Sequence, residues 1–207
     1  MSDELLKAII HHDLDEMAQA LARGADPNVI FTELNGWRPL HAAVDALEHG
    51  ASIASLVLLL RCGADVEAWD AAHTVNPLLM ALFRDRHEAV RLFLAAGANP
   101  NVVGDEGDVP LRWSVERGDR ETAKLLLYCG ADQAIDLARG FRGMNALGCA
   151  VRTLDLPMIE LLLSFGADPN RLDTRRRTAH DHLPDPQTVA PAKWSLAKAL
   201  LDRARKK

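Results

Sequence analysis

The apolar residues of this chain recur three and four positions apart in five separate segments, which is the spacing of one face of an amphipathic helix. We therefore expect five helices whose apolar faces form a core rather than a ligand site. The predicted core residues are Met17, Ala18 and Leu21; Ile53, Leu56, Leu59 and Leu60; Val90, Phe93 and Leu94; Ala123, Leu126 and Leu127; and Met158, Ile159, Leu162 and Leu163.

Each of these segments runs into the same short motif, an apolar helix end followed by Gly-Ala-Asp or Gly-Ala-Asn, as in residues 161–170, LLLSFGADPN. Glycine closes a helix in the left-handed conformation at little steric cost, and the next Asp or Asn can bond its own backbone in a turn. A period of this size indicates a stack of repeated units. The glycines are Gly24, Gly63, Gly97, Gly130 and Gly166, spaced by 39, 34, 33 and 36 residues.

A second motif stands between the glycines and predicts the start of another helix. It reads RPLHAA at 38–43, NPLLMA at 76–81, VPLRWS at 109–114 and NALGCA at 145–150, with a weaker copy, TAHDHL, at 178–183. Proline suits the first turn of a helix, where its missing N–H has no partner. The first copy closely resembles the T-P-L-H-x-A signature of ankyrin repeats, whose unit is a turn plus two helices.

The resemblance covers nearly the whole chain. It implies an all-α ankyrin-repeat solenoid of helix-turn-helix units with protruding hairpin-like loops, about five full repeats and a C-terminal capping unit. We predict a single domain over 1–207. Its units are approximately 3–37, 38–75, 76–108, 109–144 and 145–177, and the capping unit is 178–207.

Three departures from the regular unit stand out. About four extra residues near 46–51 would add one helical turn, and the loops at 28–38 and 134–145 are longer than the others. Insertions in a stack belong in loops, which often serve binding. Gly148 inside a predicted helix should cost about 1 kcal/mol relative to alanine, which predicts a weak point or a close approach between helices.

Composition supports a folded chain, with 48% apolar and 26% charged residues. The net charge of -5 argues against nucleic acid as the main partner. The polar, acidic start is unlike a secretory signal, and no span is apolar enough to cross a membrane, so we expect a cytoplasmic protein with no membrane partner. Cys62, Cys129 and Cys149 are predicted to be small buried thiols.

Motifs of catalysis are absent from the sequence: there is no phosphate-binding glycine loop, nucleophile elbow, H-E-x-x-H or paired Cys-x-x-Cys. We therefore predict a protein that is not an enzyme and holds no cofactor and no metal. His11, His12, His180 and His182 are expected at the surface, because neighbouring helical residues point apart. His41 matches the signature histidine of the family, which implies a structural residue that bonds backbone in the turn.

In ankyrin repeats the loop tips and the exposed ends of the first helices resemble fingers and a palm that form a concave binding face. The resemblance therefore implies a non-catalytic module that binds another protein. Because the chain is little more than repeats, we expect a monomer that acts as an inhibitor, an immunity-type protein or an adaptor. Large aromatic residues and arginines dominate such interfaces. The predicted partner-binding residues are Trp37, Trp69, Asp70, Phe83, Arg84, Asp105, Glu106, Trp113, Arg117, Phe141, Arg142, Arg152, Arg175 and Arg176.

The early loop tips are acidic and the later ones basic, which would orient a partner of complementary charge. Alternatives stay open at this point. The loop aromatics can instead pack on a neighbouring loop. A small metal-binding or enzymatic protein would use His180, Asp181 and His182. Binding of nucleic acid would use the C-terminal arginines, Arg139, Arg142 and Arg175 to Arg177.

Overall fold

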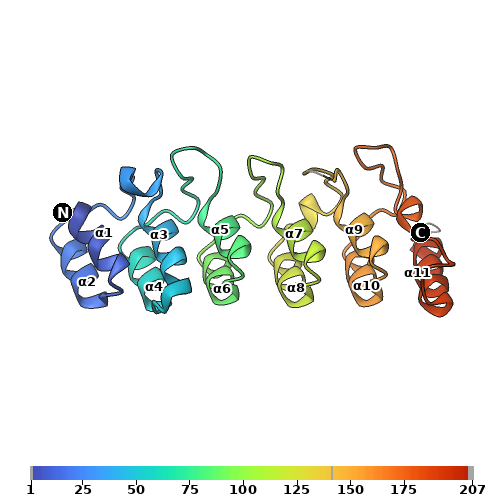
Figure 1. Ribbon diagram of the computed structural model, residues 1–207, viewed down its shortest axis with the longest axis horizontal. Helices are drawn as coiled ribbons and strands as arrows, with labels where there is room; N and C mark the ends of the chain where they lie inside the picture. The colour runs from blue at the N-terminus through green and yellow to red at the C-terminus, as the bar shows by residue number, and fades with distance from the viewer. Residues whose placement is uncertain (1, 141, 205–207) are drawn as a thin grey trace. The chain divides into compact units, whose positions relative to one another are not determined.

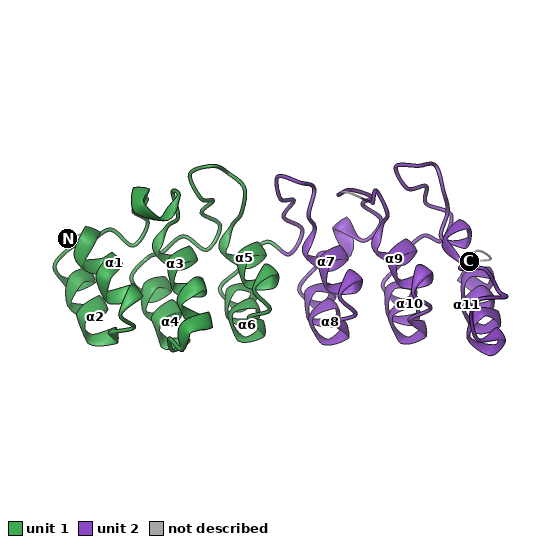
Figure 2. Cartoon of the chain, in the orientation of Figure 1, with its two compact units in different colours: residues 1–99 green, residues 100–207 purple. Residues whose placement is uncertain are grey.

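The computed structural model describes residues 2–140 and 142–204 (Figure 1). Within these residues the structure is all-helical, with eleven α-helices and no strand beyond an isolated bridge between Phe31 and Trp37. The chain forms two compact units, residues 1–99 and residues 100–207 (Figure 2). The single domain and the repeat boundaries predicted above stay predictions.

Unit 1 contains three pairs of helices. They are α1 (Ser2–Ile10) with α2 (Leu14–Ala22), α3 (Pro39–Ala46) with α4 (Ala54–Arg61), and α5 (Pro77–Phe83) with α6 (His87–Ala95). The helices of each pair pack together, and the first helices α1, α3 and α5 pack in succession. Two short 3-10 helices, η1 (Thr32–Leu34) and η2 (Leu47–His49), lie in the connections.

Unit 2 contains two further pairs and a cap. The pairs are α7 (Pro110–Glu116) with α8 (Arg120–Tyr128), and α9 (Ala146–Arg152) with α10 (Leu156–Ser164); η3 (Ala131–Ala134) lies between them. At the end, η4 (His180–His182) packs on α9 and α11 (Pro191–Ala204) packs on α10. Across the described residues, the predicted all-α class, with five helix pairs and a capping pair, is confirmed.

The helix starts follow the predicted proline motif. Proline occupies the first turn of α3, α5 and α7. At α5 the side-chain oxygen of Asn76 accepts the N–H of Leu79 at 2.9 Å, and at α9 Asn145 accepts the N–H of Gly148 at 2.8 Å. Such caps satisfy N–H groups that have no partner inside the helix.

The helix ends follow the predicted glycine motif. The five repeat glycines all have φ between 91° and 95°. In the first copy, the N–H of Gly24 donates to Leu21 O at 3.0 Å and the N–H of Ala25 donates to Ala20 O at 3.0 Å. This pair of bonds is the Schellman motif, which satisfies the last helical carbonyls. The N–H of Asn28 then donates to the Asp26 carboxylate at 2.8 Å, as the turn prediction required.

Most predicted core residues are buried, and the exceptions lie in or beside α2, α4 and α10. Ala18 is exposed, so its assignment to the core is wrong, and Ala20 is buried in its place. Ala18 lies about 100° around the helix from Met17, which rotates it away from α1. Four predicted core residues are half-buried rather than buried: Leu21, Ile53, Leu60 and Leu163.

The prediction for the cysteines is correct only for Cys149, which is buried. Burial raises the pKa of its thiol to about 12, and the carboxylate of Glu116 adds to the rise. Cys62 and Cys129 are exposed, and the prediction of buried thiols is wrong for both. Each is the C-cap residue between a helix and its glycine, beyond the stripe that faces the core.

Two irregular positions have structural explanations. The extra residues near 46–51 form η2 and a left-handed Gly50, with φ 95°, which accounts for the predicted additional turn. A Cβ placed on Gly148 would lie 2.9 Å from Cδ2 of His182. Close approach, rather than a weak helix, therefore explains the glycine in α9.

Candidate functional site

The connecting loops are folded as narrow hairpins that project from the helix pairs of each unit (Figure 1). Each of four loops is closed by a backbone hydrogen bond between its two sides: Phe31 N–H to Trp37 O at 2.7 Å, Asp70 to Val75 at 3.0 Å, Gly104 to Asp108 at 2.8 Å, and Asp173 to Arg177 at 2.8 Å. The four donors stand seven residues after a helix-ending glycine. The residues between donor and acceptor form the loop tips.

Neighbouring loops of one unit are tied together where a glycine meets the next loop. In unit 1 the N–H of Ala71 donates to Gly36 O at 2.9 Å, and a Cβ on Gly36 would collide with Cβ of Ala71. In unit 2 the N–H of Thr174 donates to Gly143 O at 3.0 Å. In each unit, a backbone hydrogen bond to the neighbouring loop therefore supports the loop that carries a tip.

Asp70 does not present its carboxylate to a partner. Its side chain is 4% exposed and accepts the N–H of Thr74 at 2.7 Å, the hydroxyl of Thr74 at 2.6 Å and the N–H of Val75 at 3.2 Å. Burial raises the pKa of this carboxyl, but these hydrogen bonds outweigh burial and hold it below its ordinary value. The prediction of Asp70 as an exposed binding residue is wrong, because the carboxylate builds the loop.

Asp173 occupies the position of Asp70 in the last loop, and its carboxylate likewise accepts backbone N–H groups of that loop. Its carboxylate accepts the N–H groups of Arg175 at 2.7 Å and Arg177 at 2.9 Å, and it lies 3.0 Å from Nε2 of His182. Despite burial, these partners keep the pKa of Asp173 below its ordinary value. The sequence analysis did not single out Asp173 and assigned Asp70 to the binding face, although the shared position seven residues after a repeat glycine could have indicated a common structural role.

The predicted loop tryptophans of unit 1 are half-buried. Trp37 lies in the bridge with Phe31. Trp69 has its ring centroid 6.4 Å from that of His73 at a tilt of 33°, and its carbonyl accepts Nε–H of Arg38 at 2.7 Å. Part of each indole therefore packs on the loops, and part stays open to solvent.

Phe83 and Arg84 lie at the end of α5, and both are half-buried. The guanidinium of Arg84 lies 2.9 Å from the carboxylate of Asp45 and 2.8 Å from that of Glu48. The hydrogen bond from Arg84 holds the pKa of Glu48 below its ordinary value. Because Glu48 belongs to η2, the inserted turn supplies a counter-charge for this predicted binding residue.

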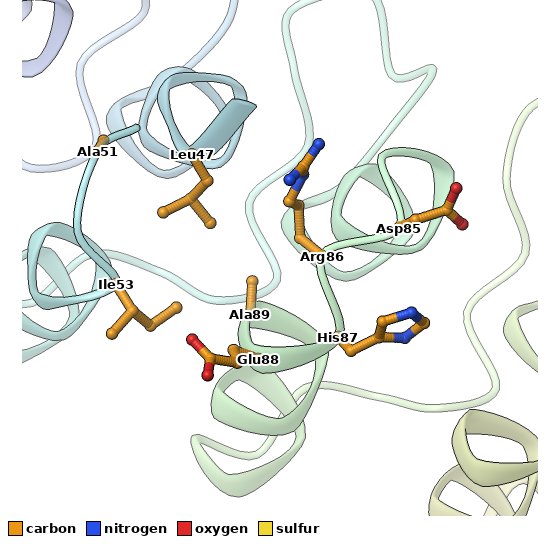
Figure 3. Close-up of a pocket in the computed structure, with 8 residues that line it drawn as sticks. All are labelled: Leu47, Ala51, Ile53, Asp85, Arg86, His87, Glu88 and Ala89. Atoms are coloured by element: carbon orange, nitrogen blue, oxygen red, sulfur yellow. The ribbon is translucent and has the colours of Figure 1, made fainter. Parts of the chain in front are cut away.

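The insertion also borders a pocket of about 330 Å³, drawn in Figure 3. Leu47, Ile53 and Ala89 point toward its centre, whereas the side chains of Asp85 and His87 point away from it (Figure 3). The pocket is at the small end of the range for ligand sites and is lined on one side by aliphatic groups. We assign no ligand to it.

In unit 2 the structure places the predicted residues in two groups. Trp113 is half-buried, and the guanidinium of Arg117 lies 5.8 Å from the centroid of its ring. The other described residues of the prediction are exposed: Asp105, Glu106, Arg142, Arg152, Arg175 and Arg176. Phe141 lies outside the described residues.

The three residues of the alternative metal site face different partners. Nε2 of His180 lies 2.9 Å from Asp202, the carboxylate of Asp181 accepts the N–H of Thr178 at 2.7 Å, and His182 bonds Asp173. Within residues 2–140 and 142–204 no three His, Cys, Asp or Glu side chains converge as metal ligands. His182 is also buried, so its predicted surface position is wrong; its ring packs against Gly148.

His41 has the structural role that the family resemblance implied. Its Nδ1 accepts the N–H of Arg38 at 3.3 Å, which leaves Nε2–H to donate to Val75 O at 3.1 Å. The ring thus joins the start of α3 to the next loop. Burial lowers the pKa of His41, against a smaller opposing effect of its bond to Val75.

No helix in the described part of the chain is both long and apolar enough to cross a membrane. A family model for ankyrin repeats, built from three copies, matches residues 45–136 and also residues 78–173. The chain belongs to the ankyrin repeat family. Ankyrin repeats form protein–protein interaction modules that are generally non-catalytic, and the predicted family is confirmed.

Solved structures with this fold span the full ankyrin-repeat chain. The ankyrin repeat protein EF0377 is 24% identical, with a TM-score of 0.76 and 98% of both chains covered. A chain in the complex of the predatory endopeptidase Bd0816 from Bdellovibrio bacteriovorus with immunity protein Bd3460 is 22% identical, with a TM-score of 0.70. It covers 99% of this chain and 96% of its own length. At these identities the likeness concerns the fold.

Curated relatives share the repeats within much longer proteins. The E3 ubiquitin-protein ligase KEG of Arabidopsis thaliana is 29% identical over 70% of this chain and 9% of its own length. The human ankyrin repeat and MYND domain-containing protein 1 is 28% identical over 79% of this chain and 23% of its length. The human B-cell lymphoma 3 protein is 29% identical over 68% of this chain and 31% of its own length. The chain thus spans less than a third of each of these relatives.

Proposed function

We propose that this ankyrin-repeat chain binds another protein through its loop tips and the exposed ends of its first helices, and acts as an inhibitor, an immunity-type protein or an adaptor. One observation carries the proposal: four loops keep the same closing hydrogen bond while the tip residues between its ends differ from loop to loop. A loop backbone closed in the same way in several repeats, with exposed side chains that differ from loop to loop, is suited to recognising one partner. The cytoplasmic location and monomeric state predicted above belong to this proposal.

The chemistry of the tips supports a protein partner. The half-buried Trp37 and Trp69, which flank the tips of their loops, each offer part of a large aromatic surface of the kind that dominates interfaces. The tips of unit 2 add exposed charges of both signs, from Asp105 and Glu106 to Arg175. The immunity-type role is suggested by one similar chain, which comes from a complex of an endopeptidase with an immunity protein.

The proposal is tested by site-specific photo-crosslinking in an extract of the native cells. A photoreactive phenylalanine analogue is placed singly at exposed loop-tip positions or at exposed control positions on second helices. The tips should each crosslink the same protein and the controls should not. The tip positions are Glu33, Asp105 and Arg175, and the control positions are Arg61, Lys124 and Glu160.

Crosslinks that form equally well from both sets, or from the second helices alone, would show that the loops are not the binding face. Because all six side chains are exposed, the substitutions should leave the fold intact, and the circular dichroism spectrum of each variant provides that check.

A further inference from the structure

We infer that unit 2 recognises an acidic segment of its protein partner that carries one apolar side chain. The segment would lie across an arginine cluster, defined as Arg142, Arg175 and Arg176, and beside an adjoining groove. This inference rests on the proposed function and specifies the chemistry of the partner.

The two loops that carry the cluster are joined directly. Both the N–H and the hydroxyl of Thr174 donate to Gly143 O, at 3.0 and 3.2 Å. A Cβ on Gly143 would collide with the Thr174 hydroxyl, so only glycine permits this approach without movement. Arg142 and Arg175 each stand one residue from this junction, which sets their backbones side by side.

The positive charge of the cluster is not neutralised from within. Asp173, the carboxylate nearest in sequence, is buried and is engaged by Arg177 at 3.2 Å and by His182 at 3.0 Å. The guanidinium groups of Arg142, Arg175 and Arg176 are exposed and form no ion pair within residues 2–140 and 142–204. Three adjacent cations without counter-charges attract a partner with several carboxylates.

The net charges of the two units also favour an acidic partner for unit 2 over unit 1. Unit 1 has 7 basic and 14 acidic residues, a net charge of -7, whereas unit 2 has 17 basic and 15 acidic residues, a net charge of +2. The net charge of -5 for the whole chain is therefore the sum of an acidic unit 1 and a slightly basic unit 2. An acidic segment is drawn to unit 2 and repelled by unit 1, which provides orientation as well as attraction.

A groove of about 390 Å³ adjoins the cluster, between residues 132–138 and 171–174. Its apolar lining includes Ile135, Leu137 and Leu172, and the side chain of Leu172 is 49% exposed. Asp132, Asp136 and Arg171 also line the groove, and the carboxylate of Asp136 accepts the N–H of Asp168 at 3.0 Å. The carboxylates of the lining outnumber its one guanidinium, so the groove favours an uncharged, apolar side chain over a further carboxylate.

These features favour a protein segment over nucleic acid. The apolar side chains of Ile135, Leu137 and Leu172 that line the groove can pack on an apolar side chain of a protein but offer no hydrogen bond to a phosphate group. The carboxylates of Asp132 and Asp136 in the groove would also repel phosphates. Nucleic acid is therefore the competing outcome of the test.

The test uses the full chain and synthetic probes in fluorescence anisotropy. The main probe is a fluorescein-labelled peptide of about 12 residues, long enough to span the two loops, with several glutamates around one leucine in a glycine-serine background. Matched probes replace every glutamate by glutamine, or the leucine by serine. A labelled oligothymidylate serves as the nucleic-acid probe. Titrations are made at about 50 and about 200 mM salt.

The glutamate-leucine peptide should bind at least about tenfold more tightly than its glutamine form, and less tightly at the higher salt concentration. The double variant Arg175→Gln/Arg176→Gln should weaken this binding about tenfold. The matched control Arg61→Gln/Arg91→Gln removes two exposed charges from the second helices of unit 1 and should change binding by less than about twofold. Unchanged thermal unfolding of both double variants establishes that each is folded.

Equal binding of the glutamate and glutamine peptides, equal losses in the two double variants, or equal binding of the leucine and serine peptides would overturn the inference. Tighter binding of oligothymidylate than of the acidic peptide would also overturn it. Loop-tip crosslinks to a protein, combined with failure of the acidic peptide, would leave the proposed function standing without this specificity. Absence of loop-tip crosslinks would instead refute the proposed function itself.

Discussion

At the scale of single residues, one buried contact joins three segments at the end of unit 2. His182 in η4 bonds the carboxylate of Asp173, which in turn accepts two backbone N–H groups of its own loop. Gly148 in α9 leaves room for the imidazole ring. A residue that looks unfavourable in the helix is thus required by the residue that packs on it.

Replacing Gly148 with alanine should therefore destabilise the protein. Helix propensity alone predicts a gain of about 1 kcal/mol, but the added Cβ would lie 2.9 Å from Cδ2 of His182 and 3.2 Å from Oδ1 of Asn145. Overpacking of this kind costs about 1–3 kcal/mol, so the net effect should be a loss, measured by urea unfolding.

A double-mutant cycle identifies the cause of that loss. In a His182→Ala background the ring is absent, and Gly148→Ala should become neutral or stabilising. If Gly148→Ala were equally destabilising in both backgrounds, contact with His182 would not be the reason for the glycine.

His41 predicts a dependence of stability on pH. Its ring is buried and neutral in the folded state, and burial lowers its pKa below the ordinary 6.5. The unfolded chain then binds more protons between the folded pKa and 6.5, so stability is complete above this range and is lost as the pH falls through it. Urea unfolding should therefore show a lower free energy of unfolding at pH 5.5 than at pH 7.5.

A His41→Asn variant should be less stable at pH 7.5 but should lose less stability on acidification. Some dependence should remain, because burial and Arg177 also lower the pKa of His182. The carboxyls of Asp70 and Asp173 have lowered pKa values, so they affect stability only below about pH 5 and do not interfere between pH 5.5 and 7.5. An unchanged pH dependence in the variant would contradict this role of His41.

At the scale of elements, the helices are short and depend on their ends. The helices of the five pairs span seven to nine residues, too few for independent stability in water. Capping side chains and left-handed glycines therefore matter as much as helix propensity. The start of α5 is the clearest case, because its cap Asn76 is fully buried.

Asn76→Ala should cost about 1–2 kcal/mol of stability, because it leaves the N–H of Leu79 without its 2.9 Å partner. Asn76→Ser should cost less, since a serine hydroxyl can cap the same N–H and the substitution also removes Nδ2 of Asn76, which has no hydrogen-bond partner. Urea unfolding of both variants compares the two. Equal losses would mean that packing, not capping, explains Asn76.

At the scale of the whole molecule, the exposed features of the two units differ in kind. Unit 1 carries the half-buried loop tryptophans and a net charge of -7, and unit 2 carries the arginine cluster and a net charge of +2. An apolar contact on unit 1 and an electrostatic contact on unit 2 would together select one partner more strictly than either alone.

Trp69→Ala should weaken binding of the crosslinked partner by about tenfold or more, because a partly exposed tryptophan beside a loop tip is the type of residue that dominates interfaces. Binding is measured with the purified partner by calorimetry. The matched control is Tyr128→Ala, which removes a 71% exposed aromatic side chain at the end of α8, away from the loop tips. Comparable losses in the two variants would exclude a specific role of Trp69.

The sequence by itself determined the number of helix pairs, their ends and the family. These features depend on backbone preferences that act within a few residues, such as the left-handed glycine after each second helix and the proline or asparagine at the start of several first helices. The role of His41 followed from the same motif.

The tertiary structure alone decided which loop residues are free to bind. In the sequence Asp70 looks like an exposed acidic residue of a loop tip, and His182 looks like a surface histidine. Both are buried, Asp70 by its bonds to Thr74 and His182 by its contact with Asp173. Cys62 and Cys129 resemble core residues, yet both are exposed beyond the packed stripe. Burial depends on what the neighbouring loop and the next helix cover, and a local pattern of residue types does not contain that information.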